Sequence, residues 1–223
     1  MNAKNGLRCG DILALVHHCL ERAIPLSEEH SASYSRCGFP DETTRAGFCD
    51  YVRTLAAVHR AHIIAENEVL FPRFRALLPD APFDDLIAQH ARMAAVLGRV
   101  WERVEGAYWE SAPERTLAGL NRTLGELRTL WTPHRRIEEA HLSPAALSAR
   151  LDPEEDQSLA ARLAELSLDY AGPDYLVMPF ALYNLARSDR RLISEAMAPL
   201  VIHRLIPGAW RDKWRPMSPF LLL

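Results

Sequence analysis

The chain reads HIIAENEVLFP at residues 62–72 and HRRIEEAHLSP at residues 134–144. Both stretches follow one pattern, His-x3-Glu-x3-Leu-x-Pro, and they lie 72 residues apart. A single His-x3-Glu pair is common by chance and usually places a surface histidine beside a carboxylate one helical turn away. Two copies with the same leucine and proline downstream are much harder to obtain by chance, so they indicate an internal repeat.

The repeat extends to two further histidines. His17 and His90 lie 73 residues apart, and each has a leucine four residues before it and apolar residues three and seven residues after it. His18 lacks this apolar frame, so we rank it below His17 as a candidate ligand. The chain is therefore expected to contain two related pairs of helices.

Apolar residues with helical spacing predict four long helices. They are expected at about residues 11–30, 44–78, from after Pro82 to about 110, and from 113 to about 142. The stretch 31–44, rich in serine and glycine, is predicted to be a loop, and Pro133 predicts a kink. No stretch of useful length shows the alternating apolar and polar residues that are typical of a β-strand. The expected fold is all-α, an up-down-up-down antiparallel four-helix bundle.

The predicted bundle covers residues 8–148, and residues 149–223 form a predicted C-terminal helical extension packed on it. The last part, 206–223, is crowded with proline, tryptophan and leucine and is expected to be an irregular tail. We expect this apolar tail to cover the bundle. A contact with a protein partner or a second copy in a homodimer is the alternative.

Charge and composition exclude several classes of partner. The net charge is −3 and no run of Lys or Arg stands out, so a nucleic acid partner is not expected. No stretch approaches the ~20 apolar residues that span a membrane. Residues 1–11 lack the apolar segment that is typical of a signal peptide. We therefore predict a cytoplasmic protein. Its four cysteines form no Cys-x-x-Cys pair and are predicted to be reduced thiols.

The chemistry of the repeat points to metal. Residues four apart share one face of a helix, so His62 with Glu66, and His134 with Glu138, can each direct an imidazole and a carboxylate to one point in the bundle interior. Four histidines and two glutamates buried without a cation would be costly as unpaired polar groups. A pair of metal ions removes that cost.

Imidazole and carboxylate ligands without thiolate suit iron or manganese better than structural zinc. From the two-fold repeat we infer two iron ions, with manganese or zinc as alternatives. His17 and His62 would bind one ion, and His90 and His134 the other. Glu66 and Glu138 would bridge them. This ligand count leaves coordination positions for a small oxidant such as dioxygen, peroxide or nitric oxide.

The sequence resembles the hemerythrin-like, or HHE cation-binding, family over roughly residues 8 to 145. The resemblance rests on the two copies of His-x3-Glu together with the histidines at 17 and 90. It implies a four-helix bundle with a non-haem di-iron centre. Functions in that family range over dioxygen carriage, iron or oxygen sensing, repair of iron-sulfur or nitrosylated iron centres, and peroxide turnover.

One departure from the family argues against simple oxygen carriage. Oxygen-carrying members have His-x3-His on the third helix, whereas here Ala94 follows His90 at the fourth position. The repeat matches Ala94 with Glu21, which is either an extra carboxylate near one ion or a surface residue. His59, three residues before His62, could approach the site or a proton path, but we favour the interpretation that it is a polar group on the flank of its helix.

Three functions remain open from the sequence. The first is a di-iron protein that binds or reduces a small oxidant. The second is an iron- or oxygen-responsive protein in which the metal controls stability or partner binding. The third, which we rank last because all six ligand residues are present, is a scaffold without metal.

Overall fold

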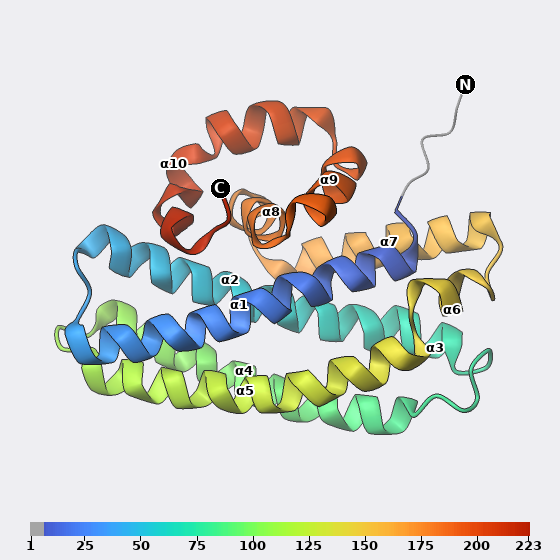
Figure 1. Cartoon of the computed structure of the whole chain (residues 1–223), viewed down its shortest axis with the longest axis horizontal. Helices are drawn as coiled ribbons and strands as arrows, with labels where there is room; N and C mark the ends of the chain where they lie inside the picture. The colour runs from blue at the N-terminus through green and yellow to red at the C-terminus, as the bar shows by residue number, and fades with distance from the viewer. Residues whose placement is uncertain (1–6) are drawn as a thin grey trace.

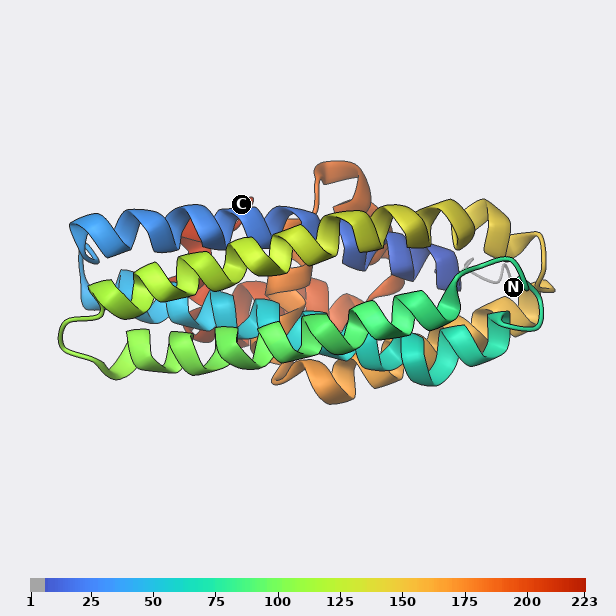
Figure 2. The same ribbon diagram turned by 90° about the horizontal axis from the view of Figure 1, so that it is seen from below.

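The computed structural model describes residues 7–223, and every regular element in this range is helical, as predicted. Four long helices lie side by side in both views (Figures 1 and 2). They are α1 (Cys9–Cys37), α2 (Glu42–Ala65), α4 (Phe83–Trp109) and α5 (Glu114–His141). Residues 1–6 lie outside the described range, so the expectation drawn from the segment 1–11 falls largely outside it.

The prediction of a loop over residues 31–44 is wrong for its first half, because α1 continues through it. The hydroxyls of Ser31 and Ser35 each donate a hydrogen bond of 2.9 Å to the main-chain carbonyl three residues earlier. A serine that bonds back to its own helix in this way does not interrupt it. The remaining loop is short, and Asp41 ends it by accepting a hydrogen bond from the main-chain N–H of Thr44.

The second helix changes its hydrogen bonding at the first glutamate of the repeat. The predicted single helix gives way to a π-helical turn, η1 (Glu66–Leu70), and then to α3 (Phe71–Phe74). The N–H of Phe71 donates to the carbonyl of Glu66, five residues earlier. In the second copy of the repeat, α5 has ended and the short helix α6 (Pro144–Ser148) begins. The repeated proline, which has no N–H, therefore marks a departure from regular α-helix after each glutamate.

The C-terminal part of the chain lies along one side of the long helices, over α1 and α2 (Figure 1). The helix α7 packs against both of them. The elements of this extension are α7 (Pro153–Ala171), α8 (Asp174–Asn184), α9 (Arg187–Ala196), η2 (Val201–Ala209), α10 (Arg211–Trp214) and η3 (Arg215–Phe220).

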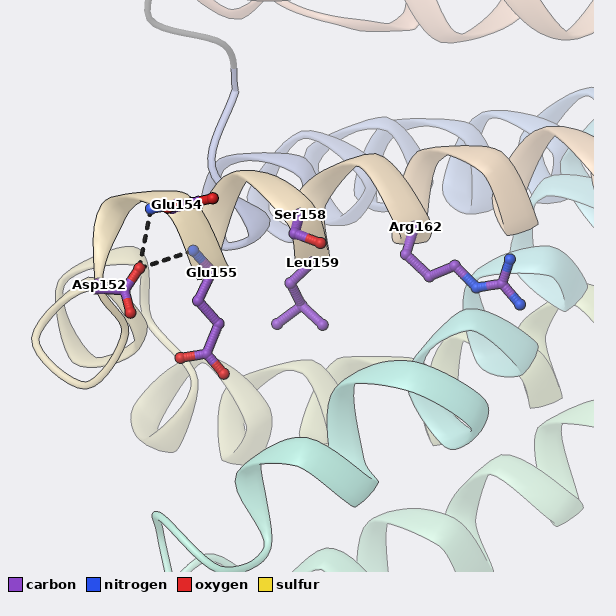
Figure 3. Close-up of a pocket in the computed structure, with 6 residues that line it drawn as sticks. All are labelled: Asp152, Glu154, Glu155, Ser158, Leu159 and Arg162. Carbon is purple, nitrogen blue, oxygen red and sulfur yellow. Dashed lines mark hydrogen bonds between the residues drawn. The ribbon is translucent and has the colours of Figure 1, made fainter.

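The helix α7 begins at a capping carboxylate. Figure 3 shows Asp152 accepting hydrogen bonds from the main-chain N–H groups of Glu154 and Glu155, at 3.0 and 2.8 Å. The carboxylate satisfies two donors that the helix itself leaves unpaired. A wide hollow opens beside this turn, and none of the six candidate ligands lines it. The hollow is therefore separate from those six residues.

The tail is helical rather than irregular. Its residues form one π-helical, one α-helical and one 3₁₀ segment, because prolines keep interrupting any longer helix. Arg22 of α1 donates a 2.9 Å hydrogen bond to the carbonyl of Phe220 and another bond to the side chain of Asn184. Tyr51 of α2 also donates to Asn184, at 2.6 Å. Phe220 is buried, so the tail covers the bundle.

The long helices and the extension share their hydrophobic cores. One core joins Leu55 and Leu124 of the long helices to Phe180 and Phe220 of the extension. A second core joins residues of α1, α3 and α4 to α7. Among residues 7–223, no helix is both long enough and apolar enough to cross a membrane.

Candidate metal centre

Each of the four long helices contributes a histidine to the interior. The two glutamates follow a histidine by one turn, one at the start of η1 and the other in α5. At most 5% of the surface of any of these side chains is exposed. The six residues are His17 of α1, His62 of α2, Glu66 of η1, His90 of α4, and His134 and Glu138 of α5.

These side chains form two overlapping groups of four. The first contains His17 and His62 with both glutamates, and the second contains His90 and His134 with the same two glutamates. Within each group, one ligand atom from every residue lies within 4.8 Å of the others. The division into histidine pairs is the one that the repeat predicts.

Each glutamate reaches into both groups. The Oε2 atom of Glu66 lies 3.3 Å from Nε2 of His62 and 3.2 Å from Nε2 of His90. Glu138 repeats this arrangement with the other two histidines, at 3.2 and 3.3 Å. A carboxylate in such a position can contact two cations at once, so each glutamate lies where it could serve both groups.

The donor atoms fit a cation better than they fit one another. All four carboxylate oxygens of Glu66 and Glu138, and Nε2 of His17 and of His62, are buried without a hydrogen-bond partner. The close contacts among them are not aligned as hydrogen bonds. Buried polar atoms in proteins are nearly always paired, and leaving a charged group unpaired is costly. Cations between these atoms would satisfy all of them.

Polar side chains next to the candidate ligands contact the Nδ1 atoms of the histidine rings. Nδ1 of His17 lies 3.1 Å from a carboxylate oxygen of Glu139, and Nδ1 of His90 lies 2.8 Å from the amide oxygen of Asn67. Asn67 and Glu139 each directly follow a ligand glutamate, so they are equivalent in the repeat. Such bonds fix the orientation of a metal-binding imidazole and its tautomer.

The bonds at Nδ1 leave Nε2 free to bind metal. A carboxylate only accepts hydrogen bonds, so Glu139 places the ring proton of a neutral His17 on Nδ1 and the lone pair on Nε2. The side-chain oxygen of Gln89 lies 3.0 Å from Nδ1 of His134 and has the same effect. Nε2 of His90 and Nε2 of His134 are 3.1 Å apart. Two lone pairs at this distance repel unless a cation lies between them.

Burial and close charges separate the pKa values of these groups. Burial raises the pKa of Glu66 well above its usual range, and the nearby carboxylate of Glu138 raises it further. Burial acts in the same direction on Glu138, but the close imidazoles of His134 and His17 outweigh it and hold its pKa well below the usual range. Burial lowers the pKa of His90 to about 3. Without metal, Glu66 therefore holds a proton more tightly than Glu138 does, and His90 is neutral at pH 7.

Two buried side chains beside the ligands have no clear sequence signature. His59 is fully buried, not on the flank of its helix as we expected, and neither ring nitrogen has a hydrogen-bond partner. Its ring meets the edge of Trp131, with centroids 4.9 Å apart, and Trp131 also packs against His17 and His62. The spacing of three residues between His59 and His62, which share a helix face, is the signal that could have located it.

The remaining candidates lie outside the centre. His18 is exposed and pairs with Asp189 of α9 at 2.9 Å. Glu21 is half-exposed and pairs with Arg135 at 2.8 Å. Ala94, its equivalent in the repeat, is also exposed. Neither copy of the repeat therefore places an additional ligand at this position.

A buried set of four histidines and two glutamates, drawn from four helices, defines a metal-binding helical protein. A family model for the hemerythrin HHE cation-binding domain matches residues 10–146, which is more than half of the chain. The chain therefore belongs to the hemerythrin HHE cation-binding family, as its sequence indicated. Comparisons with curated proteins and with solved structures found no match.

Proposed function

We propose that this chain is a non-haem di-iron protein, built on an up-down-up-down bundle, that binds and reduces a small oxidant such as dioxygen, peroxide or nitric oxide. The observation that carries the proposal is the pair of four-residue groups that share both carboxylates. Each ion would have two imidazoles of its own and two bridging glutamates. Such inward-facing histidines and glutamates are how helical bundles build dinuclear sites.

The donor set favours iron. Both groups offer only imidazole nitrogen and carboxylate oxygen, and neither contains a cysteine. These ligands suit iron or manganese, whereas a structural zinc site is usually closed by thiolates and imidazoles. An ion held by four protein ligands would keep coordination positions for the oxidant. Iron bound there would supply the electron transfer to the oxidant.

The protein's own groups would hold the oxidant and exclude water. Both ring nitrogens of His59 and the Nε1 atom of Trp131 are buried without partners, and both rings lie close to His62. An N–H on either ring can donate a hydrogen bond to a small polar molecule beside it. The surrounding core keeps bulk water away from the centre.

Peroxide consumption tests this proposal when an electron donor is supplied for the two electrons that each peroxide needs to form water. The Glu138→Ala variant should lose iron-dependent turnover at least tenfold, because a bridging carboxylate is gone. The Glu126→Ala variant is the matched control, since Glu126 lies on the same helix but pairs with Arg99 at the surface. Equal turnover by the wild type and Glu138→Ala would contradict the proposal.

A second candidate function is iron sensing through the extension. The helix α1 carries both His17 and, five residues later, Arg22, which holds the carbonyl of Phe220 in the tail. Loss of metal could therefore loosen the tail and expose it to a partner. Faster proteolysis of residues 206–223 in the metal-free protein than in the iron-loaded protein would support sensing, and equal cleavage would contradict it.

A further inference from the structure

A large cavity lies between the long helices and the extension. Its volume is about 420 Å³, within the size range of small-molecule binding sites. The helices α1 and α2 form one wall, and α7, α8, α9 and η2 form the others. Residues that represent these walls are Ile12, Val58, Leu168, Met178, Ile193 and Val201.

The walls of this cavity are aliphatic. They carry no charged side chain among the described residues, and their only polar side chains are Ser167 and His62. Val16, Met178 and Ala181 keep part of their surface exposed although they face the interior of this cleft. Apolar surface that remains in contact with water gains free energy when an apolar molecule covers it. A charged ligand would lose hydration here without gaining a partner.

The cavity adjoins the metal centre. A second cavity of only about 20 Å³ is lined by Glu66 and His62, and it shares Val16 and Ser167 with the larger one. The two cavities therefore meet at His62. An occupant of the larger cavity would lie directly against one ligand of the first group.

The internal repeat shows that this side of the centre is built differently. Gln89 directly precedes His90 and accepts the hydrogen bond from Nδ1 of His134. The residue in the equivalent position, before His17, is Val16, which cannot hydrogen-bond to His62. Val16 lines the cavity instead. One half of the centre is thus closed by an amide, and the other half faces an aliphatic wall.

We propose that this cavity is a binding site for an uncharged, largely aliphatic molecule, which lies beside His62. The volume is far greater than one water needs, about 30 Å³ in the liquid, so a diatomic gas alone would leave it mostly empty. The aliphatic walls and the absence of charge fit a hydrocarbon chain with at most one neutral polar group. Binding itself does not depend on metal. Only its position beside a metal ion rests on the proposed function.

Displacement of Nile red by 1-dodecanol from the metal-free full chain tests the site. We expect saturable binding of one molecule per chain. Two substitutions fill the cavity from different helices, Ala181→Phe in α8 and Ser167→Leu in α7, and each should weaken dodecanol binding at least tenfold. Ala95→Phe is the matched control, because Ala95 is exposed on α4 and lines none of these cavities, and its affinity should equal that of the wild type.

Three results would overturn the proposal. The first is that dodecanol does not displace Nile red saturably from the wild type. The second is that both filled variants bind dodecanol as tightly as the wild type and melt at the same temperature, and the third is that the wild type binds dodecanoate more tightly than dodecanol. A repeat with iron-loaded protein separates this inference from the proposed function. Dodecanol should shift the iron absorption bands in the wild type and should not shift them in Ala181→Phe. Protein that binds dodecanol but no iron would contradict the proposed function and leave the cavity site intact.

Discussion

Glu139 and Asn67 hold His17 and His90 by equivalent bonds, although one is a carboxylate and the other an amide. The carboxylate gives the stronger bond, because a charged acceptor binds a ring N–H more tightly than a neutral one. It also makes the neighbouring imidazole more basic. Burial lowers the pKa of His17, but the close carboxylates of Glu138 and Glu139 outweigh burial and raise this pKa. The two halves of the centre are therefore electrostatically different.

Replacement of Glu139 by alanine should weaken metal binding about 10- to 100-fold, the usual effect of losing a residue that orients a metal-binding histidine. The His17 ring would keep its nitrogen donor but lose its fixed orientation. Competition with a coloured chelator measures the affinity. Glu126→Ala, on the exposed face of the same helix, should bind metal like the wild type. An unchanged affinity in Glu139→Ala would contradict the orienting role.

His59 should make the metal-free protein less stable in acid. Burial, followed by the neighbouring histidines, lowers its pKa to about 3, against 6.5 in the unfolded chain. Between these values only the unfolded state takes up the proton, so stability falls as pH falls, by about 1.4 kcal/mol per pH unit. From pH 7.5 to pH 5 the wild type should therefore lose about 2 kcal/mol more than His59→Leu.

Urea unfolding of the metal-free proteins at the two pH values measures this difference. His203→Leu, at an exposed histidine of the extension, is the control and should lose as much stability as the wild type. Parallel losses in the wild type and His59→Leu would show that the folded state accepts the proton on His59.

The sequence predicts which side chains cluster in the interior better than it predicts the residues that support them. The repeat located all six residues that the structure brings together, because helical spacing fixes which side chains share a face. Asn67 and Glu139 also lie at equivalent positions, yet an amide and a carboxylate do not resemble each other as a motif. Gln89 was missed because its partner, His134, lies on another helix.

At the level of elements, the contact between α2 and η3 depends on a glycine. A Cβ atom added to Gly47 would collide with the main-chain carbonyl of Pro216, so only glycine lets the tail approach α2 this closely. The tail then places Phe220 against Phe48 and Tyr51 of α2, with ring centroids 5.6 Å apart in both cases. The tail therefore keeps its position because it packs this closely against α2.

Gly47→Ala should therefore destabilise the protein by about 1–3 kcal/mol, the usual effect of overpacking, reduced by the better helix propensity of alanine. Hydrogen exchange should increase within η3, where the tail is displaced. Gly98→Ala is the matched control on α4: nothing lies within 4 Å of its added Cβ, so it should be neutral or stabilising by up to about 1 kcal/mol. Stabilisation by Gly47→Ala would contradict the close approach.

Element boundaries were harder to predict than element types. The four long helices were expected from their apolar spacing, but α1 extends seven residues beyond its predicted end because its serines bond back to the helix. The π-helical turn at Glu66 has no pattern of its own in the sequence. The tail was expected to be irregular because its prolines exclude a long helix, although they allow the short segments that form.

For the whole molecule, metal binding and stability should be coupled. The six candidate ligands come from the four long helices and η1, whose cores also include the extension, so the site exists only in the folded chain. Metal at 100 times its dissociation constant would then add about 2.7 kcal/mol of stability. Calorimetry should show a higher melting temperature with iron than with a chelator. The same melting temperature in both would mean that metal does not bind the folded state selectively.

Acid should release the metal, because ligands must lose their protons to bind it. The pKa of Glu66 is raised, so a proton competes with metal for this carboxylate first. Metal affinity should fall steadily from pH 7.5 to pH 5, as measured by chelator competition. An affinity independent of pH would indicate that the bound ion uses other ligands.

The division of the chain at residue 148 and a cytoplasmic location stay predictions from sequence. The family model ends near the predicted boundary, at residue 146. Buried side chains of the extension nevertheless lie in the same two hydrophobic cores as buried side chains of the long helices. The sequence predicted that the extension packs on the bundle, but it could not predict which side chains form the shared cores or that a cavity lies between the two parts, because both depend on packing between segments far apart in the chain.

Elemental analysis of protein produced with iron available tests the central claim most directly. The account predicts close to two irons per chain in the wild type and in Glu126→Ala, with absorption bands that change when peroxide is added. It predicts a clear loss of iron in Glu138→Ala, which removes a ligand shared by both groups. Folded wild-type protein that contains no iron, or that keeps two irons per chain in Glu138→Ala, would contradict it.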